Sequence, residues 1–73
     1  MENISERTTI IELYEKYQDL LTQAHKQALY LYYFEDLSYS EIAKELAMTR
    51  SGAFDAVKKA KEKLLDIDKK IAK

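Results

Sequence analysis

The stretch from Ser38 to Leu65 reads SYSEIAKELAMTRSGAFDAVKKAKEKLL and contains the start signals of two helices. Ser38 is followed three residues later by Glu41, a pattern typical of a capping box, in which each side chain satisfies a backbone N–H at the helix start. Thr49 is a good cap for the second helix, because a run with apolar residues at helical spacing follows it directly. The two starts predict a short helix, a break at residues 47–49 and a longer basic helix.

The apolar residues of this stretch fit a helix-turn-helix better than a plain helical hairpin. Ala43 falls where the two helices would approach most closely, and only a small side chain fits at such a crossing. Met48 is an apolar turn residue, which a hairpin does not need. The residues expected in one shared core are Ile42, Leu46, Met48, Ala53 and Val57. We therefore predict a helix-turn-helix over residues 38–65, with an ordinary helical hairpin as the alternative.

The length and composition limit the chain to a small domain without metal or disulfide support. The 73 residues include no cysteine and one histidine, His25, which we expect on the surface. A domain of this size buries only about 60% of the surface of its unfolded chain, so oligomerisation is a natural reinforcement. We predict one domain over residues 1–73, no cofactor and no metal. No glycine-rich phosphate loop or nucleophile–base set suggests an enzyme.

Hydropathy and charge point to a cytoplasmic protein with one basic helix. No apolar run approaches the roughly 20 residues that span a bilayer, and the N-terminus shows no signal-peptide pattern, so we expect no membrane insertion. The net charge is only −1 but unevenly distributed. Acidic residues gather in the first helix: Glu2, Glu6, Glu12, Glu15 and Asp19. Basic residues gather in the last: Arg50, Lys58, Lys59, Lys61 and Lys63. This asymmetry suits a groove-facing helix, although a lysine-rich solvated face is the simpler alternative.

The rest of the chain is predicted to be helical, giving an all-α fold: a small bundle of four helices with an extended C-terminal helix. The first helix is expected from near Ser5 or Thr8 to Leu21, with Thr9 as an alternative start. The second should be capped by Thr22 and run to about Glu35. It is apolar on most sides, which is typical of a central helix.

The last helix carries apolar residues in alternating steps of three and four beyond the motif. These residues are Val57, Ala60, Leu64, Ile67 and Ile71. Such spacing is typical of a coiled-coil seam, and it favours a homodimer through residues 57–71. The alternative is that this end of the helix folds back on the first helix of the same chain.

Several short motifs resemble those of the YlxM-like proteins, small bacterial helix-turn-helix proteins related in shape to the sigma-factor region that reads the −35 element. The matching residues are Tyr17-Gln18, Leu20-Leu21-Thr22, Lys26-Gln27, Leu31-Tyr32-Tyr33, Glu35-Asp36-Leu37-Ser38, Glu41-Ile42-Ala43, Thr49-Arg50 and Phe54-Asp55. Such proteins are usually encoded beside components of the signal recognition particle. The resemblance implies a DNA-binding regulator of transcription with a link to that targeting pathway.

Two residues and the length of the chain depart from the family pattern. Ala47 stands where many helix-turn-helix proteins carry a left-handed glycine, which costs about 1 kcal/mol if alanine must adopt that conformation. Gly52 stands where family members tend to have alanine, and glycine inside a helix costs about 0.8–1 kcal/mol. Typical members also continue through more C-terminal helix, which they use in dimer contact.

In a helix-turn-helix, the N-terminal part of the second helix enters the major groove of double-stranded DNA. Arg50 could contact guanine O6 and N7 in a two-pronged manner, and Asp55 more simply pairs with Lys58 or Lys59 on its own helix. Four lysines of this helix would lie along phosphates, namely Lys58, Lys59, Lys61 and Lys63. Ser38 and Ser40 could hold another phosphate. The predicted DNA-binding residues are Ser38, Ser40, Thr49, Arg50, Ser51, Phe54, Asp55, Lys58, Lys59 and Lys61.

A protein-interaction module is the competing interpretation. The same fold could contact a protein, such as the GTPase of the signal recognition particle or RNA polymerase, without binding DNA. The slight negative net charge, the acidic first helix, and Gly52 and Asp55 in the reading helix favour this alternative.

Overall fold

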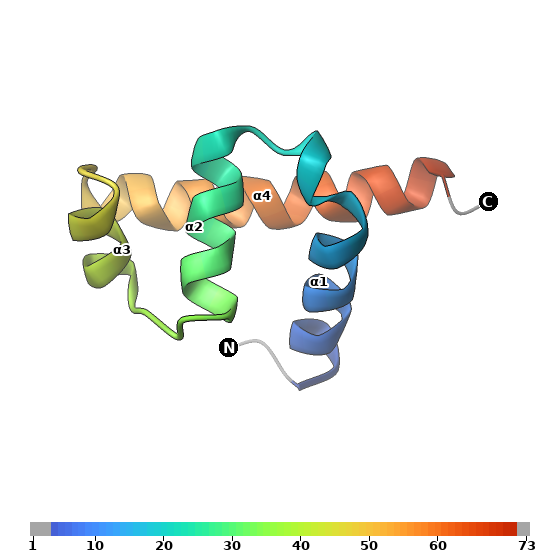
Figure 1. The fold of residues 1–73 in the computed structure, drawn as a ribbon, viewed down its shortest axis with the longest axis horizontal. Helices are drawn as coiled ribbons and strands as arrows, with labels where there is room; N and C mark the ends of the chain where they lie inside the picture. The colour runs from blue at the N-terminus through green and yellow to red at the C-terminus, as the bar shows by residue number, and fades with distance from the viewer. Residues whose placement is uncertain (1–3, 72–73) are drawn as a thin grey trace.

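The structure, a computed structural model, describes residues 4–71 and contains four α-helices and one 3-10 turn (Figure 1). Glu2, predicted in the first helix, lies outside the described residues. The elements are α1 (Ile4–Tyr17), η1 (Gln18–Leu20), α2 (Gln23–Tyr33), α3 (Tyr39–Glu45) and α4 (Arg50–Ile71). No strand occurs within residues 4–71. The predicted all-α fold with a long last helix is confirmed.

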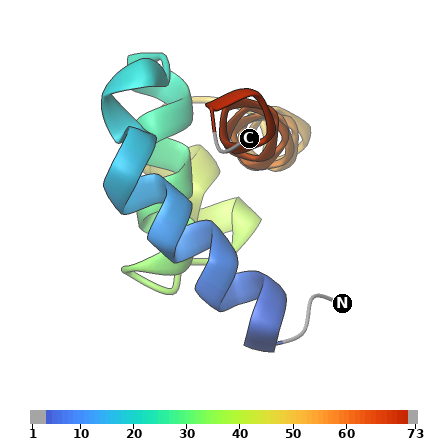
Figure 2. The same ribbon diagram turned by 90° about the vertical axis from the view of Figure 1, so that its right-hand side faces the viewer.

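Helix α4 is the element on which the others assemble. It packs against α1, α2 and α3, which follow one another along its length from the C-terminal to the N-terminal end (Figure 1). Figure 2 looks along α4 and shows these helices to one side of it. Steps of three and four residues place the buried side chains of a helix on one stripe. In α4 that stripe contains Ala53, Ala56, Val57, Ala60, Leu64 and Ile67.

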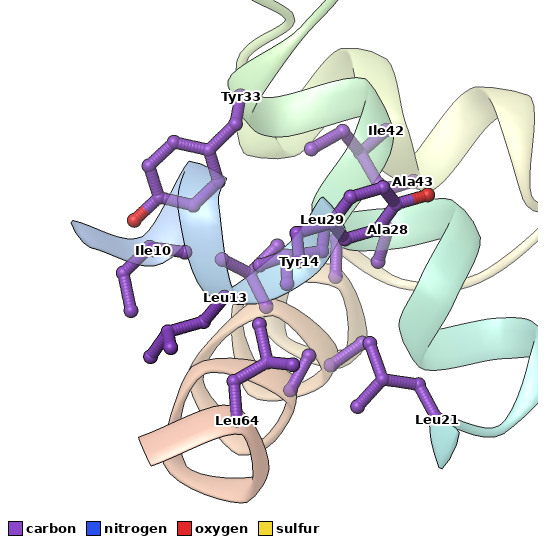
Figure 3. Close-up of a cluster of buried hydrophobic side chains, with 14 residues drawn as sticks. Ile10, Leu13, Tyr14, Leu21, Ala28, Leu29, Tyr33, Ile42, Ala43 and Leu64 are labelled. Carbon is purple, nitrogen blue, oxygen red and sulfur yellow. The ribbon is translucent and has the colours of Figure 1, made fainter. Parts of the chain in front are cut away.

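The core draws side chains from all four helices, as Figure 3 shows for most of its members. The largest fully buried side chains are Ile10, Leu29, Ile42, Val57 and Leu64. Ala43 is also buried, in agreement with the prediction that a small residue is needed where α3 meets α4. Leu46 and Met48 pack against the core from its edge.

The predicted stripe over residues 57–71 is covered by the chain itself. Val57, Ala60 and Leu64 are fully buried and Ile67 is 9% exposed, whereas Ile71 is 61% exposed. Helix α1 packs against α4, so the fold-back on the first helix, the alternative to a coiled-coil seam, is what the structure has. A homodimer stays a prediction, and it would need a surface other than the four buried residues.

The first helix is shorter than predicted, because the chain tightens into a 3-10 turn after Tyr17. The N–H of Leu21 donates to the Gln18 carbonyl at 3.1 Å, and Leu21 itself is extended. This turn buries the Leu21 side chain and leaves that of Leu20 56% exposed. The prediction of one continuous helix to Leu21 is therefore wrong. Thr22 caps α2 as predicted, by accepting from the N–H of His25 at 3.2 Å.

Arg7 of α1 closes the C-terminal end of α2, which stops at Tyr33, two residues before the predicted end. The guanidinium of Arg7 donates to the Tyr33 carbonyl at 3.0 Å and lies 5.2 Å from the centre of the Tyr33 ring. It also lies 3.9 Å from the carboxylate of Asp36, a residue with φ of 58°. A cation is favourable beside the unpaired carbonyls at a helix C-terminus, so Arg7 ties α1 to the start of the helix-turn-helix.

Candidate nucleic-acid interface

The first helix of the motif begins with the predicted capping box. The hydroxyl of Ser38 accepts from the Glu41 N–H at 3.2 Å, and a carboxylate oxygen of Glu41 accepts from the Ser38 N–H at 2.8 Å. The hydrogen bonds from the Ser38 backbone and hydroxyl lower the pKa of Glu41 from its ordinary value of 4.5. The box engages the N–H and the hydroxyl of Ser38 and sets a carboxylate at the helix start, which disfavours the predicted phosphate contact there. Ser40 is exposed and stays a candidate for that contact.

The turn between α3 and α4 is closed by backbone hydrogen bonds around a left-handed alanine. The N–H of Met48 donates to the Ala43 carbonyl at 2.9 Å, and that of Ala47 donates to the Lys44 carbonyl at 3.5 Å. These two bonds define a Schellman motif, in which the residue after the cap adopts a positive φ. Ala47 has φ of 54°, so alanine does occupy the position where glycine would be free of strain.

Thr49 caps α4, and glycine at position 52 leaves room for this cap. The hydroxyl of Thr49 accepts from the N–H of Gly52 at 3.0 Å, and α4 begins at Arg50. A Cβ on Gly52 would lie 3.1 Å from that same hydroxyl oxygen, which is tighter than ordinary van der Waals contact. The second predicted helix start is therefore confirmed, and it uses the Thr49 hydroxyl for folding.

The first two turns of α4 and the start of α3 form one exposed surface. Arg50, Ser51 and Asp55 are exposed, and the ring of Phe54 is 49% exposed. A hollow of about 450 Å³ is lined by Tyr39, Arg50, Ser51 and Phe54. We call these residues, together with Ser40, Asp55, Lys58 and Lys59, the front surface. Of the predicted DNA-binding residues, the structure brings Arg50, Ser51 and Phe54 together around one hollow, beside Tyr39.

The charges of α4 divide between this front surface and the contact with α1. Asp55 pairs with Lys59 at 3.3 Å, which is the local pairing predicted for this carboxylate. Lys58 is exposed. Lys61 instead pairs with Glu6 of α1 at 3.8 Å, and its side chain is only 25% exposed. Lys61 therefore lies toward α1, and Lys58 lines with it a second hollow beside Ser5, Glu6 and Thr9 of α1, so Lys58 lies between the front surface and this contact.

A second surface, formed by aromatic side chains of α2 and of the residue that ends it, was not predicted. Tyr30 and Phe34 are 42% and 39% exposed, and their rings stack with centres 5.1 Å apart. Beside them, a groove of about 640 Å³ runs between α2 and the turn of the motif. It includes Leu31, Leu46 and Met48. The apolar character of α2 on most sides was the available sequence signal, but it indicated a buried helix.

Neither a metal site nor a membrane-spanning helix is found in the described chain. Within residues 4–71, no three His, Asp or Glu side chains are grouped so that they could hold a metal ion. In that same range, every helix is too short or too polar to cross a bilayer.

Comparison with known proteins assigns the chain to a family. Residues 4–72 match the model of the family UPF0122, described as "Putative helix-turn-helix protein, YlxM / p13 like". A UPF0122 protein of Mycoplasma capricolum is 39% identical over 70 residues, covering 94% of this chain and 62% of the relative. UPF0122 proteins of Bacillus cereus strain AH187 and Bacillus anthracis strain A0248 are each 37% identical over 67 residues, covering 90% of this chain and 61% of the relative.

The matches cover almost all of this chain but only part of each relative. The chain spans about three-fifths of the length of these curated relatives. No solved structure matches it. The family match extends over every described helix, including both helices of the motif and the turn between them. The chain therefore belongs to the UPF0122 family of YlxM/p13-like helix-turn-helix proteins.

Proposed function

We propose that the chain is a regulator that binds double-stranded DNA, with the first two turns of α4 in the major groove. The observation that carries this proposal is the front surface: side chains at the start of α4 are exposed beside the start of α3, over a rigidly capped turn. This is the part of a helix-turn-helix that meets base edges. A bacterial transcription regulator of this kind would act in the cytoplasm.

The residues of the front surface have different roles in this proposal. Arg50 would contact guanine O6 and N7, because its planar guanidinium can donate to both acceptors at once. Lys58, Lys59 and Ser40 would contact phosphates, which position the protein without reading sequence. Thr49 acts through the fold by capping α4. Asp55 is neutralised by Lys59, so the carboxylate is less repelled by DNA than a lone acid would be.

A protein-interaction module is the second candidate, and the aromatic surface of α2 favours it. Tyr30 and Phe34 present stacked, half-exposed rings, and aromatic residues are enriched in protein interfaces. The partner proposed from the family resemblance is a component of the signal recognition particle, such as its GTPase, or RNA polymerase. This contact would use α2 and leave the front surface of α4 free.

Charge reversal at matched positions of α4 tests the DNA proposal. The double variant Lys58→Glu/Lys59→Glu changes two residues of the front surface. The control Lys69→Glu/Lys70→Glu changes the far end of the same helix, about 16 Å away at 1.5 Å per residue. Each variant breaks one i,i+4 pair with aspartate, Asp55–Lys59 at 3.3 Å or Asp66–Lys70 at 3.2 Å. Each moves the net charge from −1 to −5, since two substitutions each subtract two charges.

Fluorescence anisotropy with random-sequence duplex DNA gives the readout. If about four phosphates are neutralised, the affinity of the wild type should fall with salt at a log–log slope near −3.6. The Lys58/Lys59 variant should lose binding, while the Lys69/Lys70 variant should lose much less. Equal losses in both variants would mean that only the overall charge matters, and a flat salt response would refute the proposal. Retention of a protein partner by both variants, without DNA binding by the wild type, would favour the interaction module.

A further inference from the structure

Phe54 is the one large apolar side chain on the front surface whose ring is half exposed, and the fold holds it in place. Its ring meets the edge of Tyr39 with centres 5.2 Å apart and planes at 80°. Tyr39 stacks on Tyr32 at 5.1 Å and 6°, and Tyr32 meets the edge of Tyr33 at 4.9 Å. Tyr33 is 4% exposed. A continuous row of rings thus connects the exposed Phe54 to the core through α3 and α2.

This arrangement makes Phe54 a rigid apolar contact beside a free cation. Within residues 4–71, the Arg50 side chain forms no hydrogen bond or ion pair, and it lines the same hollow as Phe54. Hydrogen-bonding side chains can read any base, but an apolar side chain in the major groove gains most from the C5-methyl group of thymine. The methyl group is also the only apolar projection that the four bases offer in that groove.

We propose that Phe54 is a specificity-determining residue that selects a thymine close to the guanine contacted by Arg50. This inference rests on the proposed DNA-binding function. Arg50 and Phe54 are four residues apart, which is about 6 Å along the helix. Successive base pairs are about 3.4 Å apart, so the two side chains reach base pairs no more than two steps from each other. The preferred duplex therefore contains a guanine and a thymine within two base pairs, on either strand.

Uracil substitution tests this contact, because uracil differs from thymine only by lacking the methyl group. The probe is the duplex that the wild-type protein enriches from a random-sequence pool, with each thymine replaced by uracil in turn. Binding is measured by fluorescence anisotropy for the wild type, Phe54→Ala and Phe54→Leu. Circular dichroism and a thermal melt establish that the variants fold. In parallel, each guanine is replaced by 7-deazaguanine, which lacks the N7 acceptor, to locate the base contacted by Arg50.

At one thymine, replacement by uracil should weaken binding by the wild type but leave binding by Phe54→Ala unchanged. Its replacement by uracil should weaken wild-type binding about three- to fourfold, as expected for one buried methyl group. Phe54→Leu, which keeps an apolar side chain, should retain part of the response. The sensitive thymine should lie within two base pairs of a guanine whose 7-deaza replacement weakens the wild type but not Arg50→Ala.

The failures of the two proposals are distinguishable. Specific binding in which uracil has no effect, or has the same effect in Phe54→Ala as in the wild type, would overturn the role of Phe54 and leave the DNA function standing. A sensitive thymine far from the guanine of Arg50 would also overturn it. If the pool yields no enriched duplex and the protein binds no DNA, both proposals fail together.

Discussion

Replacing Ala47 with glycine should stabilise the protein, because alanine is held there in a left-handed conformation. Ala47 has φ of 54° in the turn between α3 and α4. That conformation costs a residue with a Cβ about 1–2 kcal/mol. Glycine avoids the cost but loses about 0.4–1 kcal/mol through the greater freedom of the unfolded chain. The net gain should be about 0.8 kcal/mol, which raises the melting temperature of a domain this small by about 3–6 °C.

Urea unfolding followed by far-UV circular dichroism measures this gain, and Ala24→Gly is the matched control. Ala24 is exposed in the first turn of α2, so the same chemical change should there destabilise the protein, by less than the roughly 0.5–1 kcal/mol that glycine costs in the middle of a helix. The two variants should move the urea midpoint in opposite directions. If Ala47→Gly destabilises the protein as Ala24→Gly does, the turn does not hold residue 47 in the left-handed region and the described helix-turn-helix geometry is wrong.

Four further substitutions test other contacts. Ser38→Ala should lower the free energy of unfolding by about 0.5–2 kcal/mol in urea titration, because it removes the cap of α3. Since the pKa of Glu41 is lowered in the folded state, its ionised side chain stabilises the fold above pH 4.5 and this contribution is lost as the pH falls through the folded pKa. The free energy of unfolding of Glu41→Gln should therefore differ from that of the wild type near neutral pH and become equal to it in acid. Leu64→Ala should cost about 2–5 kcal/mol, with a urea midpoint independent of protein concentration, because Leu64 is buried within one chain. A concentration-dependent midpoint would restore the coiled-coil dimer. Gly52→Ala should raise stability by less than about 1 kcal/mol, since the gain in helix propensity is offset by the 3.1 Å approach to the capping hydroxyl, and a large loss would show that the cap cannot adjust.

Local signals were readable from the sequence because both partners lie within one turn of helix. The Ser38–Glu41 box, the Thr49 cap and the Asp55–Lys59 pair each join residues three or four apart, and all are present in the structure. For Ala47 the sequence indicated only that many helix-turn-helix proteins carry a left-handed glycine at this position, and the structure shows that alanine adopts that conformation here. From these local features the positions of the two helices of the motif, and of most residues of the front surface, could be predicted.

Contacts between distant parts of the chain could not be predicted in the same way. The stripe from Val57 to Ile67 repeats in steps of three and four, and this spacing fits a coiled-coil seam as well as a face covered by α1. Only the way α1 crosses α4 decides between the two. The same packing pairs Lys61 with Glu6 and brings Arg7 to the end of α2, so neither contact could be read from local spacing.

The central claim is that the start of α4, with the start of α3 beside it, is the surface that contacts duplex DNA. Amide chemical-shift mapping tests it most directly, by adding duplex DNA to the labelled protein and locating the perturbed residues. We predict that the signals of residues 39–40 and 50–59 move, while those of Tyr30 in α2 and of Phe34 at its C-terminal end stay in place. Perturbation centred on Tyr30 and Phe34, or no perturbation at low salt, would contradict the account.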